Sequence, residues 1–351
     1  DFDTPWHIRE EGIYSLEKGR TFYTSNAGLS ELKIEISKYL DRRFDLKYDP
    51  SDEIMITVGG SEAIDGALRA MLDAGDEVIL PQPSYVSYEP CIVLADGVPV
   101  IVELKEENDF KLTREQLEKA VTDKTKILIM PFPNNPTGAI MTKEELQPIV
   151  DFVIEHDLFV ISDEIYSELT YSGNHVSIGA FPGMKERTIV INGFSKSYAM
   201  TGWRLGYAIA PENIMARIRQ YHDFNAVGCP SPLMEAAVVG LNMPLSYYDE
   251  FGAHYAHMKK IFTEGMRDIG IPFTDPEGTY FVLADISPYL KKGQSDVDFC
   301  EQLARKAGVG AVPGSSFFNE PINNIVRLHF AKKDETLYAA LDRLNHIKDM
   351  M

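Results

Sequence analysis

The sequence predicts an α/β fold, with a large domain built on a mostly parallel seven-stranded sheet between helices and a smaller α+β domain after it. Three observations lead to this prediction. Short apolar runs alternate with segments of helical periodicity through the first two thirds of the chain. The runs are apolar almost throughout, which is typical of strands buried on both faces. The alternation ends near residue 245, where a long charged segment with a helical pattern begins.

The predicted elements of the large domain follow one another as strand and helix. Strands are expected at 54–58, 77–80, 98–103, 126–130, 158–162, 188–191 and 205–210. Helices are expected at 29–44, 61–73, 84–95, 113–121 and 142–155. Two of these helices have clear start signals, because Thr113 and Thr142 each stand at capping-box spacing before Gln or Glu.

The remaining segments predict the smaller domain. Helices are expected at 246–269, near 295–307 and near 334–348, with a strand at 325–330. The first twenty residues contain Pro5 and Gly12 and show little periodicity. We therefore expect residues 22–245 to form the large domain, and residues 1–21 and 246–351 to form the small one.

The composition argues against several classes of function. The 351 residues include 34 Lys and Arg against 53 Asp and Glu, a formal net charge of −19, which repels nucleic acid and anionic membrane surfaces. No apolar run approaches the length of a membrane span, and no signal peptide is recognised. Cys91, Cys229 and Cys300 fit neither a disulfide framework nor a zinc pattern, so we expect no metal, reduced thiols and a cytoplasmic location.

Two loops that follow predicted strands have the composition of ligand-binding turns. In VGGSEA (58–63), two glycines precede a helix, whose free N–H groups attract a phosphate. In PFPNNPTG (131–138), prolines and a glycine make a rigid loop that fixes Asn135 at the end of a strand, where α/β sheets bind ligands. An ordinary tight turn explains either pattern alone.

A carboxylate and a tyrosine follow another strand in VISDEIY (160–166). Asp163 comes directly after apolar residues, where a carboxylate is costly to bury without a positive partner. Glu164 is an alternative for the buried carboxylate, and a structural ion pair is an alternative explanation of both. Tyr166 lies three residues on, within reach of the same site.

Positively charged residues stand in two further motifs. In GFSKSYAMTGWRLGY (193–207), small residues surround Lys196, whose amine becomes nucleophilic when partly removed from water and can form a Schiff base with an aldehyde. Ser195 adds a hydroxyl, and Arg204 suits a pair of phosphate oxygens. In NIVRLHFA (324–331), Arg327 lies in a strand and demands an anion, either a ligand or an internal carboxylate.

Together these groups match a single cofactor and substrate. A phosphate fits the glycine turn with Ser195 and Arg204, and an aldehyde fits Lys196. A protonated ring nitrogen fits Asp163, a ring hydroxyl fits Asn135 and Tyr166, and the carboxylate of an amino acid fits Arg327. Pyridoxal 5'-phosphate and an α-amino acid satisfy all of these requirements.

With these motifs, nearly the whole sequence resembles the class I/II aminotransferases. These have the aspartate aminotransferase fold, which is fold type I of the pyridoxal-phosphate enzymes. NNPTG, SDEIY and SK followed by GWRLGY occur in that family's order and spacing. The resemblance implies that residues at matching positions have the same roles as in the family. The Schiff-base lysine is Lys196; the partner of the pyridine nitrogen is Asp163; the groups near the ring oxygen are Tyr166 and Asn135; the phosphate ligands are Gly60, Ser61 and Arg204; the stacking aromatic is Tyr85; and the substrate carboxylate ligand is Arg327.

The resemblance also implies an assembly. Tyr23, in FYTSNAGLSEL, matches a tyrosine that reaches the phosphate of the neighbouring subunit, which implies a homodimer with shared active sites. Relatives usually have some tens of residues before DFDTPWH, including a segment that closes over the substrate. Gly193 stands where the family often has serine, so that Ser195 is expected to compensate.

The activity implied is a ping-pong transfer of an amino group from an L-amino acid to a 2-oxo acid through Lys196, Asp163 and Tyr166. Phe318, in VPGSSFFNEP, favours members similar to aromatic, kynurenine or methionine aminotransferases, and Tyr88 and Tyr280 are candidates for the wall of an aromatic pocket. A carbon–sulfur β-lyase on the same scaffold is the alternative, and a non-enzymatic regulatory domain is a more remote one.

Overall fold

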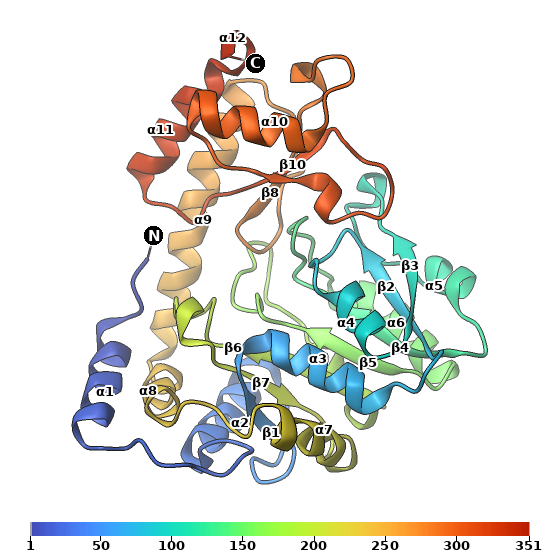
Figure 1. Cartoon of the computed structure of the whole chain (residues 1–351), viewed down its shortest axis with the longest axis vertical. Coiled ribbons are helices and arrows are strands. Elements are labelled where there is room, and N and C mark those ends of the chain that lie inside the picture. The colour runs from blue at the N-terminus through green and yellow to red at the C-terminus, as the bar shows by residue number, and fades with distance from the viewer. Residues whose placement is uncertain (1, 351) are drawn as a thin grey trace.

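The computed structural model of the chain describes residues 2–350 and contains a large sheet of seven strands (Figure 1). The strands are β1 (Ile54–Thr57), β2 (Glu77–Gln82), β3 (Val98–Glu103), β4 (Thr125–Met130), β5 (Phe159–Asp163), β6 (Thr188–Gly193) and β7 (Gly206–Ile209). All seven lie at the positions that the sequence predicts, so this part of the expected fold is confirmed.

The order of the strands places four chain segments at one edge of this sheet. The order is β1-β7-β6-β5-β4-β2-β3, and only β7 runs antiparallel to its neighbours. The remaining pairs, from β6 to β3, are parallel. The carboxyl ends of β1, β4, β5 and β6 therefore meet at the same edge, where ligands bind in sheets of this kind.

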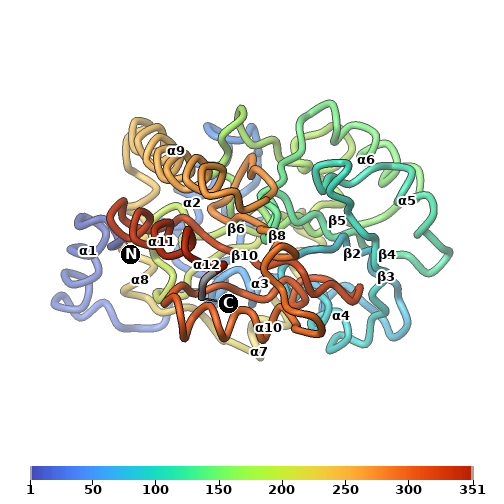
Figure 2. Tube along the Cα trace, turned by 90° about the horizontal axis from the view of Figure 1, so that it is seen from above, coloured from blue at the N-terminus to red at the C-terminus, as the bar shows by residue number. Residues whose placement is uncertain are grey.

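Helices cover both faces of the large sheet. Apolar side chains of α3 (Gly59–Met71), α4 (Tyr88–Leu94) and α7 (Glu212–Asn225) pack on one face, together with Ile127 and Ile129 of β4. Leu128 and Met130 point to the opposite face, where α5 (Arg114–Ala120) and α6 (Lys143–Glu155) pack. In Figure 2 these two groups of helices lie on opposite sides of the strands. Farther along the sheet, α2 (Ser30–Phe44) and α8 (Ser231–Leu241) pack against β1 and β7.

The rest of the chain forms a second, three-stranded sheet with its own apolar cluster. The long helix α9 (Leu245–Asp268) leads to it, and its strands β8 (Phe281–Asp285), β9 (Val312–Pro313) and β10 (Ile325–His329) pair in the order β8-β10-β9. The helices α10 (Asp296–Gln302), α11 (Asp334–Asn345) and α12 (Ile347–Met350) complete it. Met258 and Phe262 of α9 pack into this cluster, whereas Tyr248 packs with the large sheet, so α9 joins the two parts.

The division into a large domain (22–245) and a small domain (1–21 and 246–351) stays a prediction. Its terminal residues, 1 and 351, lie outside the described residues. The helix α1 (Trp6–Glu17) buries Ile8 in the cluster that contains α2 and α8, while Phe2 contacts the cluster of the small sheet. The segment before residue 22 therefore touches both parts of the molecule.

Several helices differ from the sequence expectations. Residues 84–87 lie outside any helix, since α4 begins only at Tyr88. The helix expected near 295–307 changes to a π-helical turn at Leu303, and the last helix is interrupted at His346. The helices α1, α7 and α8 were not predicted. In α1 the reason is that exposed apolar residues such as Trp6 and Leu16 obscure the periodicity.

Two sequence expectations concern absences. Among residues 2–350, no helix combines the length and the apolar character needed to cross a membrane. In the same part of the chain, no group of His, Cys, Asp or Glu side chains is arranged to hold a metal ion, and the three cysteines are free thiols.

A close backbone approach joins the NNPTG loop to the small sheet. Gly138 has a φ of +74°, and a Cβ atom added there would lie 2.4 Å from Cβ of Pro276 and 2.8 Å from the carbonyl oxygen of Gly278. The carbonyl of Gly138 accepts hydrogen bonds from the backbone N–H groups of Glu277 (3.0 Å) and Gly278 (2.7 Å). Only glycine fits here without moving the segment that leads into β8.

We predict that Gly138→Ala destabilises the protein more than Gly75→Ala. Both glycines have a positive φ, but nothing lies within 4 Å of a Cβ atom at Gly75. The control substitution should cost about 1 kcal/mol of unfolding free energy from backbone strain, and Gly138→Ala about 2 kcal/mol more from overpacking. Urea unfolding of both variants measures the difference. Equal losses would show that the close approach is relaxed without cost.

Candidate active site

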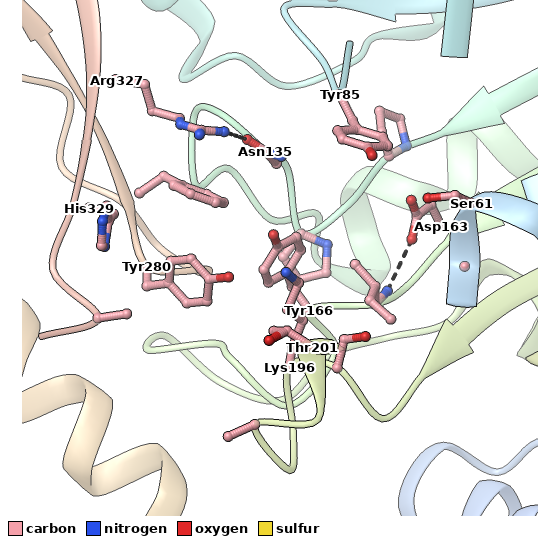
Figure 3. Close-up of a pocket in the computed structure, with 18 of the residues that line it drawn as sticks. Ser61, Tyr85, Asn135, Asp163, Tyr166, Lys196, Thr201, Tyr280, Arg327 and His329 are labelled. Carbon is pink, nitrogen blue, oxygen red and sulfur yellow. Dashed lines mark hydrogen bonds between the residues drawn. The ribbon is translucent and has the colours of Figure 1, made fainter. Parts of the chain in front are cut away.

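One cavity of about 590 Å³ lies at the carboxyl edge of the large sheet and faces the small sheet. Its lining includes nearly every residue that the sequence singles out for the site (Figure 3): Gly60, Ser61, Tyr85, Asn135, Asp163, Tyr166, Ser195, Lys196, Arg204 and Arg327. These residues come from segments that are far apart in the sequence. The structure therefore brings the predicted groups together around one space.

Tyr23 is the exception among the predicted site residues. Its side chain is 93% exposed and does not line the cavity of its own chain. Phe318 also lies elsewhere, since it lines a separate cavity of about 170 Å³ beside Gln82 and Asn319.

The phosphate-binding turn predicted at VGGSEA is the beginning of α3. The helix starts at Gly59, so the first backbone N–H groups have no partner within the helix. Gly206 of β7 packs directly beneath this turn, because a Cβ atom there would lie 2.6 Å from the carbonyl carbon of Gly59 and 2.7 Å from the nitrogen of Gly60. Gly206 thus lets β7 and the start of α3 approach each other at the cavity.

The absence of a side chain at Gly193 has a related cause. Gly193 pairs with Gly206 across β6 and β7. A Cβ atom at Gly193 would lie 2.9 Å from Cα of Gly206 and 3.0 Å from the carbonyl oxygen of Leu205. Here a serine side chain would therefore crowd β7, whereas Ser195 lines the cavity without this conflict.

Arg204 reaches the same turn from the loop after Lys196. Its backbone has a φ of +55°, and Nη1 donates a hydrogen bond to the carbonyl of Thr201 at 3.1 Å. The guanidinium lies beside Gly59, where Nη2 would be 2.5 Å from an added Cβ atom. Lys196 and Arg204 thus lie on one loop and both line the cavity, which explains their spacing in the sequence.

Lys196 enters the cavity beside two aromatic rings. Its Nζ atom lies 5.6 Å from the ring centre of Tyr166 and 5.9 Å from that of Tyr280. The loop is held from the far side by α9, since the hydroxyl of Tyr247 donates to the carbonyl of Ser197 at 2.6 Å. The base of the lysine is thereby fixed while its amine faces the open space.

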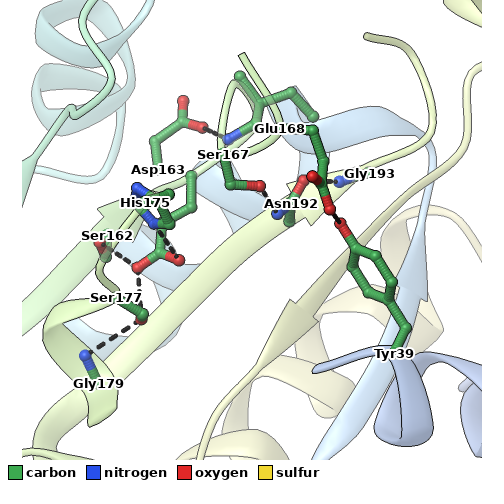
Figure 4. Close-up of polar contacts among 12 residues, drawn as sticks. Tyr39, Ser162, Asp163, Ser167, Glu168, His175, Ser177, Gly179, Asn192 and Gly193 are labelled. Carbon is green, nitrogen blue, oxygen red and sulfur yellow. Dashed lines mark hydrogen bonds and ion pairs between the residues drawn. The ribbon is translucent and has the colours of Figure 1, made fainter. Parts of the chain in front are cut away.

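Asp163 and Glu164 are both buried, but they face different environments. Glu164 accepts hydrogen bonds from Ser162 (2.9 Å) and Ser177 (2.6 Å), and its other oxygen lies 2.9 Å from Nε2 of His175 (Figure 4). Asp163 faces the cavity instead. The sequence left open which of the two carboxylates is buried. In the structure both are buried, but Glu164 is hydrogen-bonded within the protein, whereas Asp163 lines the cavity.

Asp163 has two hydrogen-bond donors. The hydroxyl of Tyr88 donates to Oδ2 at 2.7 Å, and the backbone N–H of Ile165 donates to Oδ1 at 3.2 Å. Burial raises the pKa of Asp163 and is the largest effect, while these two donors and the nearby Lys196 act in the opposite direction. Among residues 2–350, no cationic side chain donates a hydrogen bond to this carboxylate.

The opposite wall of the cavity carries Arg327, held by Asn135. Nη1 of Arg327 donates to Oδ1 of Asn135 at 2.6 Å. The guanidinium carbon lies 4.2 Å from the ring centre of Phe281 and 4.8 Å from that of Phe317. Burial lowers the pKa of Arg327. Within residues 2–350 no ion pair of Arg327 with a carboxylate is found, so this part of the chain gives no support to an internal carboxylate partner.

The cavity also contains residues that the sequence analysis did not select as site residues. Thr201 lies on the loop between Lys196 and Arg204, and His329 lies two residues after Arg327 on the same face of β10. Partial removal from water and the nearby positive charges of Lys332 and Arg327 lower the pKa of His329, although its side chain is exposed. The alternation of side chains along a strand is the signal that points to His329.

Comparisons with known proteins agree with the motifs. Residues 1–344 match the family described as aminotransferase class I and II. The aspartate aminotransferase of Pyrococcus abyssi (strain GE5 / Orsay) is 40% identical, covering 99% of this chain and 89% of that protein. The aromatic-amino-acid aminotransferase 2 of Thermococcus litoralis is 39% identical over the same shares of the two chains.

A solved structure extends the agreement to the fold. The crystal structure of an aromatic aminotransferase from Pyrococcus horikoshii OT3 matches with a TM-score of 0.94 at 39% sequence identity, covering 99% of this chain and 93% of that one. These matches favour amino transfer over the carbon–sulfur lyase and the regulatory domain. The chain is an enzyme of the class I and II aminotransferase family, as its motifs indicated.

Proposed function

We propose that this aminotransferase binds pyridoxal 5'-phosphate in the 590 Å³ cavity and moves an amino group from an L-amino acid to a 2-oxo acid in two successive half-reactions. The observation that carries the proposal is that Lys196, Asp163 and Arg327 line one space. An amine, a buried carboxylate and a half-buried guanidinium are the groups that the cofactor aldehyde, its ring nitrogen and an amino acid carboxylate require.

The described residues fit the cofactor group by group. The free N–H groups at the start of α3, with Ser61, Ser195 and Arg204, suit a phosphate, and glycine at 206 keeps that cradle open. In the described part of the chain, the buried carboxylate of Asp163 has no cationic hydrogen-bond partner, and it suits a protonated ring nitrogen. Tyr85 lines the same wall as a flat aromatic surface and suits stacking on the ring (Figure 3).

When bound, pyridoxal phosphate supplies an aldehyde and a ring that withdraws electrons from the substrate Cα. Lys196 would hold the cofactor through its aldehyde, and its amine, when free, would be the base that takes the proton from the substrate Cα. The two rings beside its Nζ atom limit the directions the amine can take. Asp163 would hold a proton on the ring nitrogen, because a buried carboxylate is stabilised by a cation beside it.

Arg327 and Asn135 bind the carboxylate of the substrate. The hydrogen bond from Arg327 to Asn135 fixes one edge of the guanidinium, and the rings of Phe281 and Phe317 fix its plane. Its remaining N–H groups suit a carboxylate, with Arg–carboxylate pairs among the strongest hydrogen bonds in proteins. Binding at this point orients Cα toward Lys196 across the cavity.

The first test replaces the amine. Lys196→Ala should reduce turnover by several orders of magnitude and remove the absorbance of covalently held cofactor, because Lys196 is the amine assigned to the cofactor aldehyde. Lys119→Ala, at an exposed position, is the control and should behave like the wild type. Visible absorbance spectra and steady-state rates measure the effect. Unchanged spectrum and rate in Lys196→Ala would refute the assignment.

The substrate side chain is proposed to be aromatic. Tyr255 and Tyr280 line the cavity with ring centres 6.0 Å apart and nearly parallel planes, and Phe2 lies beside Tyr255. Such rings gain free energy by packing on an aromatic side chain. The similarity to the aromatic-amino-acid aminotransferase of Thermococcus litoralis supports the same choice.

A screen of half-reactions tests this substrate class. Each amino acid is added alone, and conversion of the bound cofactor is followed by absorbance. Phenylalanine, tyrosine or kynurenine should react at least about fivefold faster than aspartate at equal concentration, since one aromatic contact contributes about 1 kcal/mol or more. Phenylalanine amide should fail, because Arg327 then has no carboxylate to bind. A preference for aspartate would contradict the proposal.

We further propose a homodimer in which Tyr23 completes the partner's site. The neighbouring Phe22 is 80% exposed and Phe224 is 92% exposed, and exposed rings of this size mark a contact surface. The protein should sediment at about twice the 39.5 kDa of one chain. Tyr23→Phe should weaken cofactor binding, whereas Tyr338→Phe at another exposed position should not. A monomer with full cofactor affinity would contradict both statements.

A further inference from the structure

Tyr88, the first residue of α4, lines the cavity beside Asp163 and Tyr85. Its side chain is 2% exposed, and its hydroxyl donates to Oδ2 of Asp163 at 2.7 Å. Its ring meets that of Tyr85 edge to face, with centres 5.6 Å apart and planes at 83°. One side chain therefore contacts both the carboxylate and the aromatic residue on the cofactor side of the cavity.

We propose that Tyr88 is a positioning residue that keeps Asp163 ionised and fixes which of its oxygens faces the cofactor. The proposal rests on the binding of pyridoxal phosphate proposed above. Oδ2 is held by Tyr88 and Oδ1 by the backbone of Ile165, so the carboxylate cannot rotate without breaking one of two hydrogen bonds. Asp163 reaches the cofactor, whereas Tyr88 acts through Asp163.

A second buried carboxylate in the same segment shows why the donor matters. Glu168 also accepts a hydrogen bond from a buried tyrosine, Tyr39, at 2.6 Å (Figure 4). In addition it has Arg43, whose Nε and Nη2 donate to its two oxygens at 3.0 Å and 2.6 Å. Asp163 has the tyrosine but not the arginine. The hydroxyl of Tyr88 is therefore a larger share of what stabilises the charge of Asp163.

The charged and titratable groups around the pair set the direction of the effect. Glu164, next in the chain, raises the pKa of Asp163, and Lys196 lowers it. Tyr166 and Tyr85 lie near Tyr88, and burial raises the pKa of Tyr88 itself, so that its hydroxyl stays protonated and remains a donor. Removing this donor raises the pKa of Asp163 further.

The experiment measures the dissociation constant of pyridoxal phosphate against pH, using apoprotein and quenching of intrinsic fluorescence. Affinity falls as the pH drops through the pKa of Asp163, because the neutral acid no longer attracts a protonated ring nitrogen. Tyr88→Phe keeps the ring and its contact with Tyr85 but removes the hydroxyl. The acid limb of the curve should move upward by about one pH unit, as expected for one hydrogen bond to a charged group.

Tyr39→Phe is the matched control. It removes the same kind of hydrogen bond to a buried carboxylate, and Tyr39 does not line the cavity. Both variants should lose similar thermal stability, but the acid limb of Tyr39→Phe should coincide with that of the wild type. A purely structural role of Tyr88 would lower stability without moving the limb, and that result overturns the inference.

A second variant keeps the test valid if Tyr88→Phe does not fold. 3-Fluorotyrosine at position 88 has a more acidic hydroxyl, which is a stronger donor, so the acid limb should move downward. No movement would count against the inference. If the wild-type protein binds no pyridoxal phosphate at any pH, the proposed function itself fails and this inference with it, whereas normal binding with unmoved limbs overturns only the role of Tyr88.

Discussion

A buried carboxylate at the carboxyl end of β5 is the constraint on which the site depends. Removing a charge from water costs several kcal/mol unless a partner compensates. Glu164 and Glu168, in the same short segment, have serine, histidine, tyrosine and arginine partners. Asp163 has one phenol and one backbone amide. A positively charged group of a ligand in the cavity would stabilise this carboxylate further, which is the basis of the proposed cofactor site.

The sheet topology supplies the other groups around this carboxylate. Parallel strands place the loops after β1, β4, β5 and β6 at one edge, so the start of α3, Asn135 and Lys196 meet there without long connections. Arg327 comes from the small sheet, and its position relative to the large sheet depends on two connections between them. One is α9, which contributes to both apolar clusters, and the other is the contact of Gly138 with the segment before β8.

The sequence predicted the strands of the large sheet, β10 and most of the cavity residues because those signals are local, whereas β8 and β9 were not predicted. Apolar runs mark these strands, and most of the predicted ligand-binding residues follow a strand or stand in a motif with Gly or Pro, whereas Arg327 lies within a strand. Tyr88 was noted only as a possible wall residue, since its role depends on a hydrogen bond to a residue 75 positions away. Gly193 lacks the serine hydroxyl that the family often has there, and only the structure gives the reason, which is its close packing against Gly206. Helix α1 was missed because its exposed apolar face obscures the period.

Nitrogen NMR of the protein loaded with pyridoxal phosphate labelled at the ring nitrogen tests the central claim most directly. If Asp163 faces that nitrogen as a buried anion, the nitrogen keeps its proton throughout the neutral pH range, and its chemical shift stays that of a pyridinium. A shift typical of an unprotonated pyridine at neutral pH would contradict the claim, because Asp163 would then lie apart from the ring nitrogen or carry the proton itself.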